Sequence, residues 1–383
     1  MKKRIAVVIT NRANFARIKS FLIETNQSKK IDLKIILCGS ALTHNYGNLE
    51  QELIKNKLKI AEKSFFLLEG SEIINQSKTT GIAIVELSNI FAKLKPDLVI
   101  TIGDRYETMA TAVSAVYQNI PLAHIQGGEV SGNLDELVRH SITKLSSYHF
   151  ATSKKSYERI IKMGENRHRV FFTGCPGMDI LEKIKDMNVQ KEIKSISITG
   201  KNIEINKPYI LIVNHPDSTK NEEINCKNVK TLISAINDIR INKIMFWPNS
   251  DAYNNIIASE MRKLKEKNEI NDITYIINCT PEQYILLLKK SKCLVGNSSS
   301  FIREGSHLGK PAVIVGERQN MREVGPNVIY TKYDKKEITK KIFFQIKKRK
   351  YIKKYIYGKH DAGLKIKNLL EKINFTNKKY IAY

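Results

Sequence analysis

The sequence predicts an α/β protein of two doubly wound, Rossmann-like domains, with the functional site in the cleft between them. Short, continuous apolar runs alternate with longer helical patterns along the chain, as at residues 5–9, 33–37 and 98–102. Such runs are typical of strands in a parallel sheet that helices cover on both faces. The alternation restarts near residue 209, and 383 residues suit two domains better than one.

The first domain is predicted over residues 1–172. Further strands are expected at residues 121–125 and 148–152, joined by right-handed β-α-β crossovers. The turn-rich segment at residues 173–177 is interpreted as a hinge.

The second domain is predicted over residues 173–383, with a polar surface excursion at 189–207 and a closing amphipathic helix at 364–373. Its strands are expected at residues 209–213, 243–247, 273–277, 293–295 and 311–315. Ligands of open α/β sheets bind at the carboxyl ends of the strands, so polar residues directly after strands carry the most weight.

The formal net charge of +26 leaves two interpretations open. One is a polyanionic partner such as nucleic acid, a membrane surface or a phosphorylated substrate. The other, which we favour, is lysine dispersed over solvated faces. The exception is the basic cluster at residues 347–350 and 353–354, interpreted as a solvated helix face or as a contact for anionic lipid or nucleic acid. No nucleic-acid recognition motif is present, so no such partner is expected.

The five cysteines are odd in number and far apart, and none forms a C-x-x-C pair. We therefore expect neither a disulfide framework nor a zinc site. The sequence shows no signal-peptide core and no bilayer-length apolar stretch, which favours a soluble, cytoplasmic protein without an integral membrane segment. The first strand-helix turn lacks G-x-G-x-x-G, which argues against a dinucleotide cofactor.

Gly103, Asp104 and Arg105 follow the strand at residues 98–102 directly. Asp104 is interpreted either as a base or charge partner in the cleft, or as the N-cap of a helix that begins near Tyr106. Arg105 offers a planar guanidinium that suits a phosphate.

The next strand end carries His124, Gln126, Gly127, Gly128 and Glu129. The glycines permit close backbone approach to a ligand, and their N–H groups can hold an anion. His124 alone is more typical of a hydrogen-bonded core histidine than of a catalytic one.

A short helix then presents Asp135, Arg139, His140 and Lys144. So many titratable groups near two adjacent strand ends are difficult to explain as scaffold. The segment from Gly103 to His140 is therefore the predicted catalytic floor.

The second half repeats the pattern with His215 after one strand and Ser298, Ser299 and Glu304 after another. Hydroxyls and free N–H groups at a helix N-terminus form a phosphate site, although a serine N-cap with a solvated Glu304 explains part of this pattern. Arg12, in the first strand-helix turn, is also expected to face phosphate.

Taken together, these positions resemble the hydrolysing UDP-N-acetylglucosamine 2-epimerases, including the epimerase half of the animal bifunctional sialic-acid enzyme. The resemblance covers nearly the whole chain. Its anchors are Asn11-Arg12-Ala13, Gly103-Asp104-Arg105, residues 127–132, Asp135 with residues 139–145, His215-Pro216, Pro248-Asn249 with Asp251-Ala252, residues 296–299, Arg303-Glu304 and residues 316–319.

The resemblance implies a GT-B-like fold, a homo-oligomer (dimer or tetramer), and a reaction that uses no metal or other cofactor. A base removes the proton at sugar carbon 2 while UDP leaves, and water adds to the resulting 2-acetamidoglucal to give N-acetylmannosamine. The catalytic candidates are Asp104, Asp135, Glu129 and His215. The substrate-binding candidates are Arg12, Arg105, Gln126, Arg139, Ser298, Ser299, Glu304 and Arg318.

Gln126 departs from the family pattern, because it stands where the animal enzyme has a catalytic glutamate. An amide cannot exchange a proton usefully, so either Glu129 and the aspartates share that work or the substrate differs. Three alternatives therefore stay open: UDP-N-acetylglucosamine for sialic-acid supply, UDP-2,4-diacetamido-2,4,6-trideoxyglucose for legionaminic-type sugars, or a GT-B glycosyltransferase.

Overall fold

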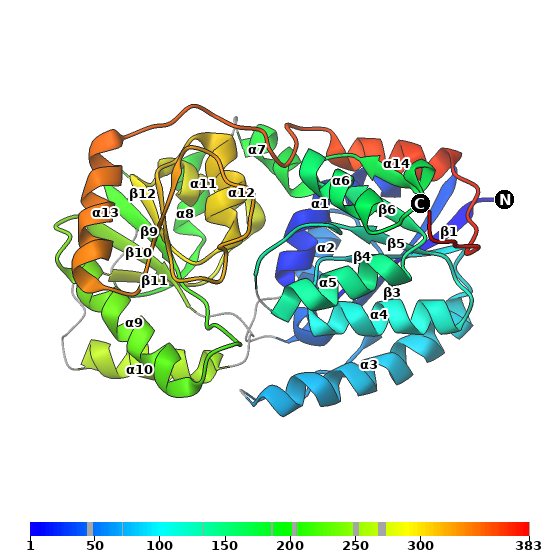
Figure 1. Cartoon of the computed structure of the whole chain (residues 1–383), viewed down its shortest axis with the longest axis horizontal. Helices are drawn as coiled ribbons and strands as arrows, with labels where there is room; N and C mark the ends of the chain where they lie inside the picture. Colours follow the sequence, from blue (N-terminus) through cyan, green and yellow to red (C-terminus); the bar gives the residue numbers. More distant parts are fainter. Residues whose placement is uncertain are drawn as a thin grey trace.

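The computed structural model describes residues 1–43, 49–70, 72–132, 134–184, 187–200, 204, 206–247, 253–266 and 273–382. It consists of two halves that lie side by side, each built on one sheet (Figure 1). The anchors Pro248-Asn249 and Asp251-Ala252 lie outside the described residues.

The first sheet is parallel throughout, with strand order β3-β2-β1-β4-β5-β6-β7. Its strands are β1 (Lys3–Ile9), β2 (Ile31–Cys38), β3 (Ile60–Ser64), β4 (Leu98–Ile102), β5 (Leu122–Ile125), β6 (Tyr148–Ala151) and β7 (Val170–Phe172). The strands predicted in this half are confirmed, and β3 and β7 extend the sheet at its two edges.

Helices cover both faces of this sheet, as the continuous apolar strands require. They are α1 (Arg12–Asn26), α2 (Leu49–Lys55), α3 (Ile73–Leu94), α4 (Tyr106–Tyr117), α5 (Leu134–Leu145) and α6 (Lys154–Lys162). One core cluster joins the sheet to α1 and α2, and a second joins its other face to α3, α4 and α5.

The second sheet has strand order β14-β13-β12-β9-β10-β11-β8. Its strands are β8 (Ser197–Gly200), β9 (Tyr209–Val213), β10 (Asn242–Phe246), β11 (Ile273–Asn278), β12 (Cys293–Gly296), β13 (Ala312–Val315) and β14 (Val328–Thr331). The helices around it are α7 (Ile180–Lys183), α8 (Val189–Lys194), α9 (Glu222–Asn237), α10 (Asn254–Glu266), α11 (Pro281–Lys290), α12 (Ser299–Leu308) and α13 (Lys335–Lys348).

The strands predicted in the second half are confirmed, but the interpretation of residues 189–207 as a surface excursion is wrong in part. Within that stretch α8 forms, and β8 pairs antiparallel with β11 at the edge of the sheet. An edge strand has one pairing partner and can be polar on its open side, so β8 lacks the continuous apolar run of a central strand.

The chain crosses between the halves twice, and the two crossings lie side by side. The N–H of Cys175 donates to the carbonyl of Tyr357 at 2.8 Å. Gly174 has a φ of +82°, and a Cβ there would lie 3.1 Å from the Cα of Gly358. This close approach explains why the segment predicted as a hinge contains glycine.

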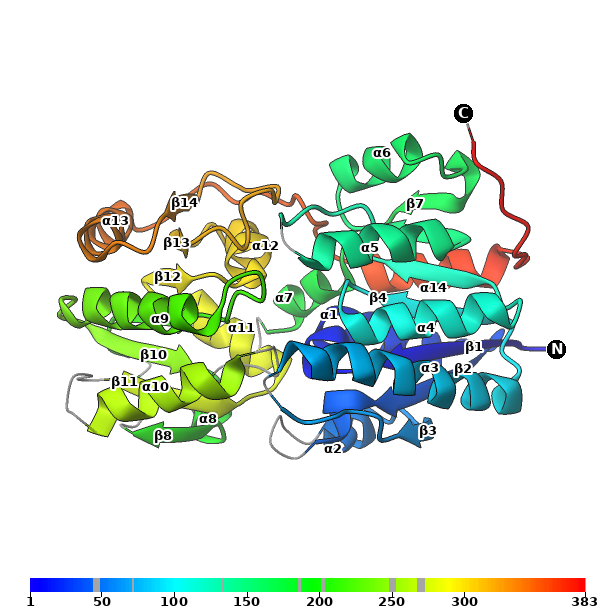
Figure 2. The same ribbon diagram turned by 60° about the horizontal axis from the view of Figure 1, so that its bottom comes forward.

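After the second crossing, the last helix, α14 (Ala362–Lys372), packs on the first half, where Figures 1 and 2 show it beside β1 and α1. Ile366 and Leu370 are fully buried in the core cluster that contains β1. The prediction that this helix closes the second domain is therefore wrong, although the boundary at residues 172 and 173 stays a prediction. No helix in the described ranges is both long and apolar enough to cross a membrane.

Truncating Leu370 to alanine tests the docking of α14. We expect Leu370→Ala to lower the free energy of unfolding by about 2–5 kcal/mol, because it leaves a cavity in a closed core. Leu364→Ala, the same change on the same helix at a side chain that is 40 % exposed, is the control. Urea unfolding measures both variants, and equal losses would contradict the packing described.

Candidate active site

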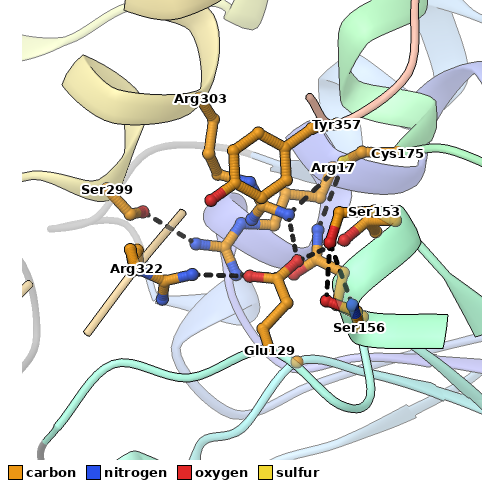
Figure 3. A network of polar contacts seen from close by, with 12 residues as sticks. Arg17, Glu129, Ser153, Ser156, Cys175, Ser299, Arg303, Arg322 and Tyr357 are labelled. Atoms are coloured by element: carbon orange, nitrogen blue, oxygen red, sulfur yellow. Dashed lines mark hydrogen bonds and ion pairs between the residues drawn. The ribbon is translucent and has the colours of Figure 1, made fainter. Parts of the chain in front are cut away.

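The carboxyl ends of the two sheets meet at the interface between the halves. Arg17 of α1 donates through Nη2 to Oγ of Ser299 at 3.4 Å. Arg303 of α12 donates to Glu129, which follows β5, at 2.6 Å. Figure 3 shows these side chains converging from both halves. The predicted floor of the first half therefore faces the nucleotide-site candidates of the second.

The Glu129 carboxylate lies at the centre of this interface and is 5 % exposed. Its Oε1 accepts from Thr152 at 2.5 Å and from Arg303 at 2.6 Å, and its Oε2 accepts from Arg322 at 2.5 Å. Burial alone would raise the pKa of Glu129, but the guanidiniums of Arg303 and Arg322 outweigh burial and lower it to about 2. Glu129 is therefore ionised and engaged on both oxygens.

Asp104 is held by Arg139, which comes from α5. Arg139 donates to Asp104 Oδ2 from Nε at 2.9 Å and also from Nη2, and to the carbonyl of Glu129 at 2.8 Å. Burial opposes ionisation of Asp104, but Arg139 and Arg17 hold the pKa of its carboxyl well below the usual range. The interpretation of Asp104 as a helix N-cap is wrong, because Arg105 occupies the N-cap position of α4.

Arg105, expected beside the diphosphate, is engaged with a neighbour on its own helix. It donates from Nε to Oε2 of Glu107 at 3.1 Å and from Nη2 to Oε1 at 3.2 Å. Glu107 is completely buried, so the guanidinium supplies a counter-ion that this carboxylate needs.

Gln126 is 2 % exposed and adopts a φ of +73°, a left-handed conformation that is costly for a residue other than glycine. Its Oε1 accepts from Arg17 Nη1 at 3.0 Å, and its Nε2 donates to Sγ of Cys175 at 3.3 Å. Both ends of the amide are thus used to hold Arg17 and the chain crossing at Cys175.

His124 is part of the scaffold, as its sequence context indicates. Its ring nitrogens lie 2.8 Å from the carbonyl of Gly103 and 3.3 Å from Oγ1 of Thr143. Burial lowers its pKa to about 3, so it is neutral at ordinary pH. Asp135 lies half-buried in the first turn of α5, one turn before Arg139, which places a second carboxylate beside the floor.

The N-terminus of α12 forms the opposing wall. Ser298 is the N-cap and accepts from the N–H of Ser300, whose hydroxyl also bonds Ser298 at 2.8 Å and the phenol of Tyr284. Ser299 lies in the first turn and accepts from Arg17. A helix N-terminus with ordered hydroxyls is an anion site.

Asn297 joins two strand ends of the second half. Its side chain accepts from the N–H of His215 at 2.7 Å and donates to the carbonyl of the same residue at 2.8 Å. His215, at the end of β9, is thereby fixed beside the N-terminus of α12. Arg318 follows β13 and lies near the phenol of Tyr333.

Arg12 Nη1 in the first half and Glu304 Oε2 in the second are among the buried side-chain atoms without a hydrogen-bond partner in the described residues. Burial lowers the pKa of Arg12 and raises that of Glu304. Buried polar atoms in native proteins normally have partners, and a ligand bound between the halves would supply those that these two atoms lack.

The interface also carries surplus positive charge. Arg17, Arg139, Arg303 and Arg322 surround the two carboxylates of Asp104 and Glu129. These four guanidiniums outnumber the two carboxylates that they surround, and Asp135 and Glu304 lie near enough to interact with Arg139 and Arg303. Such a concentration of guanidiniums suits an anionic ligand. In the described part of the chain, no group of three or more His, Cys, Asp or Glu side chains is arranged to hold a metal ion.

Sequence reasoning missed Arg17 and Arg322. Arg17 lies in the second turn of α1, five residues beyond Arg12, and reaches the interface only because its side chain is long. Arg322 lies between β13 and β14, in a segment without an apolar pattern. The sequence did hold one indication that further cations were needed. Asp and Glu outnumber Lys and Arg between residues 103 and 140, and buried carboxylates require cationic partners.

The family model described as UDP-N-acetylglucosamine 2-epimerase matches residues 23–371. The chain belongs to the UDP-N-acetylglucosamine 2-epimerase family. It is 31 % identical to a hydrolysing UDP-N,N'-diacetylbacillosamine 2-epimerase of Legionella pneumophila, over 86 % of this chain and 85 % of the relative. It is 29 % identical to a hydrolysing GDP/UDP-N,N'-diacetylbacillosamine 2-epimerase of Campylobacter jejuni, over 86 % of this chain and 84 % of that one.

Solved structures of the family share the fold. The UDP-GlcNAc 2-epimerase of Neisseria meningitidis, bound to UDP-GlcNAc, matches with a TM-score of 0.80 at 20 % identity, over 97 % of this chain and 100 % of that chain. The enzyme of Methanocaldococcus jannaschii, in complex with UDP-GlcNAc and UDP, matches with a TM-score of 0.79 at 19 % identity, over 96 % and 99 %. The predicted fold, with two Rossmann-like domains in a GT-B-like arrangement, is confirmed.

Replacing Glu129 by glutamine tests the ion cluster between the halves. We expect Glu129→Gln to lower the free energy of unfolding by about 3–5 kcal/mol, because it leaves the buried guanidiniums of Arg303 and Arg322 without their counter-ion. Glu323→Gln, which removes the charge of another acceptor at the interface, bonded to Ser153, is the control. Chemical denaturation measures both, and a loss no larger than the control's would contradict the role of Glu129.

The pH dependence of stability gives a second test of the same group. The pKa of Glu129 is lowered to about 2, so its contribution is present above the unfolded pKa near 4.3 and is lost as the pH falls toward 2. Unfolding measured from about pH 5 to pH 2 is expected to show a shallower acid loss in Glu129→Gln than in the unaltered protein. Identical slopes would show that Glu129 is not ion-paired in the folded state.

Proposed function

We propose that this chain is a hydrolysing 2-epimerase that converts a UDP-linked 2-acetamido sugar to the free 2-epimeric sugar and UDP. The observation that carries the proposal is the cluster of four guanidiniums at the interface between the two sheets, together with Arg12 Nη1 and Glu304 Oε2, which have no hydrogen-bond partner in the described residues. A departing diphosphate requires cationic and N–H partners of this kind. The names of the relatives in Legionella and Campylobacter support the hydrolysing class.

UDP is proposed to bind mainly against the second half. The N-terminus of α12, with Ser298 and Ser299, faces the diphosphate together with Arg12. Arg17 extends this anion site, since it already contacts Ser299. Glu304 Oε2 is placed to accept from a ribose hydroxyl, and Arg318 contributes a further cation at the end of β13.

Proton transfer is proposed for Asp104 and Asp135, with His215 as a further group on the opposite side. Both aspartates lie at the floor, and Arg139 fixes the first of them in its ionised form. An ionised carboxylate can remove the proton at carbon 2 as UDP leaves, and a second acid/base group can return a proton after water adds to the glycal. Neutral His124 takes no part in this scheme.

Glu129 and Gln126 are proposed to position their neighbours instead of reacting. Glu129, a catalytic candidate by sequence, accepts hydrogen bonds on both carboxylate oxygens, whereas the bonds from Arg139 to Asp104 both go to Oδ2. Gln126 orients Arg17. Arg139, which the sequence offered as a substrate-binding candidate, orients Asp104. A glutamine at this position therefore keeps the anion site in place without supplying a proton.

Two substrates fit this proposal. UDP-N-acetylglucosamine would give N-acetylmannosamine for sialic-acid-type sugars, and a Neisseria meningitidis relative of 27 % identity carries the name UDP-N-acetylglucosamine 2-epimerase. UDP-N,N'-diacetylbacillosamine, the 2,4-diacetamido-2,4,6-trideoxy sugar, is favoured by the names of the relatives at 31 % and 29 % identity.

Incubation with each UDP-sugar separately, followed by NMR, tests the reaction class. We expect free 2-epimeric sugar and UDP from at least one of the two without any acceptor. A sugar that epimerises while still attached to UDP would place the chain in the non-hydrolysing class. A strict requirement for an acceptor would instead indicate a GT-B glycosyltransferase.

Asp104→Asn tests the proton-transfer assignment. We expect turnover to fall by at least about a thousandfold while the affinity for UDP, measured by titration calorimetry, changes little. Asp97→Asn is the control. Asp97 directly precedes β4, at the end of the strand away from Asp104, where it is exposed and accepts from the backbone N–H of Arg4. Undiminished turnover in Asp104→Asn would refute the assignment.

A further inference from the structure

The outward face of α13 combines lysines with two exposed phenylalanines. Lys336, Lys340, Phe343, Phe344, Lys347 and Lys348 recur at helical spacing and are all exposed; we call these six residues the basic-aromatic face. The opposite side of the helix carries the buried Ile338, Ile342 and Gln345, which pack toward the second sheet. The helix is therefore anchored on one side and open on the other.

The two phenylalanines are not needed for the core of this half. Phe343 is 51 % exposed and Phe344 is 58 % exposed, although they are adjacent in the sequence. A single exposed apolar side chain is ordinary, but two aromatic rings among four lysines form a patch with a distinct chemistry.

The lysines of this face have no counter-ions in the described part of the chain, while Lys335 and Lys341, beside the face, pair with Asp238 and Glu337. The absence of partners is thus specific to the face and is not general to the helix. A strongly positive surface without internal compensation attracts anions from solution.

The positive surface continues beyond the helix. Arg349, Lys350, Lys353 and Lys354 are exposed, and Ile352 between them is 77 % exposed. The segment runs along the end of α12, where the N–H of Tyr351 donates to the carbonyl of Gly309 at 2.9 Å. The basic cluster of the sequence therefore spans the end of α13 and the extended segment that follows it.

Lys310 shows how densely the positive charges are packed. Burial and the neighbouring Lys292 and Lys350 lower its pKa to about 8. A lysine whose neighbours are mainly other lysines carries electrostatic repulsion, which a bound polyanion would relieve.

Figures 1 and 2 both place α13 at the end of the second half that points away from the first half. The candidate active site lies at the interface between the halves, so the basic-aromatic face is remote from it. A partner bound to this face would leave the route to the active site open.

We propose that the basic-aromatic face docks the protein onto an anionic lipid surface. The lysines match acidic headgroups, and Phe343, Phe344 and Ile352 are placed to enter the boundary between headgroups and acyl chains. Ile352 cannot stack on a base, and the cations of the surface are nearly all lysine instead of the arginine that favours nucleic acid, so lipid is the better match. This docking is independent of the proposed reaction.

Vesicle co-sedimentation tests the proposal with the full chain. We expect binding to phosphatidylcholine vesicles that contain phosphatidylglycerol, no binding to phosphatidylcholine alone, and release as salt rises above about 0.3 M. Lys340→Glu combined with Lys347→Glu is expected to weaken binding at least about tenfold. Phe343→Ser combined with Phe344→Ser is expected to weaken it at least about fivefold.

Matched controls separate this face from the general charge of the chain. Lys154→Glu with Lys155→Glu makes the same charge change at exposed positions of α6. Ile73→Ser with Ile74→Ser removes two adjacent apolar side chains of similar exposure from α3. Both pairs are expected to bind vesicles like the unaltered protein, and turnover of the UDP-sugar in solution is expected to be unchanged in the α13 variants.

Three results would overturn the proposal. One is the absence of binding to anionic vesicles at low salt. Another is an equal loss of binding in the α6 and α13 charge variants, which would assign the effect to net charge. The third is tighter binding to duplex DNA or single-stranded RNA than to the vesicles, which would assign the face to nucleic acid.

Discussion

The carboxylate of Glu129 is the contact on which the arrangement of the site depends. It comes from the first half, and the two guanidiniums that hold it, from Arg303 and Arg322, come from the second. A buried carboxylate is costly without cations, and buried guanidiniums are equally costly without an anion. Each half therefore requires the other, and the floor with Asp104 is held in a fixed place opposite the N-terminus of α12.

The surplus of arginine over carboxylate turns this structural contact into a binding site. Glu129 neutralises part of the charge of Arg303 and Arg322, while Arg139 is used by Asp104. The hydrogen bonds that Arg17 donates go to the neutral groups of Gln126 and Ser299, although its charge also helps to keep Asp104 ionised. We propose that this guanidinium is the one of the four that a ligand engages most directly. Gln126 therefore contributes to anion binding by orienting Arg17, despite its unusual backbone conformation.

The sequence predicts the central strands well because their burial depends on the side chains within each strand. Residues 98–102 form β4 because its four apolar side chains and Thr101 are all buried between two layers of helices. The edge strand β8, the return of α14 to the first half, and the partners of Glu129 could not be found in this way. Each depends on contacts between residues far apart in the sequence, and Arg322 is 193 positions from Glu129.

Exchange of hydrogen at sugar carbon 2 tests the proposed reaction most directly. The UDP-sugar that the protein turns over is incubated in deuterium oxide, and the released sugar is analysed by NMR. Removal of the carbon 2 proton by a carboxylate and its replacement from solvent predict one deuterium at carbon 2 of the free epimer, together with stoichiometric UDP. A released sugar that retains its original hydrogen at carbon 2 would contradict proton transfer at this floor and the function proposed for the chain.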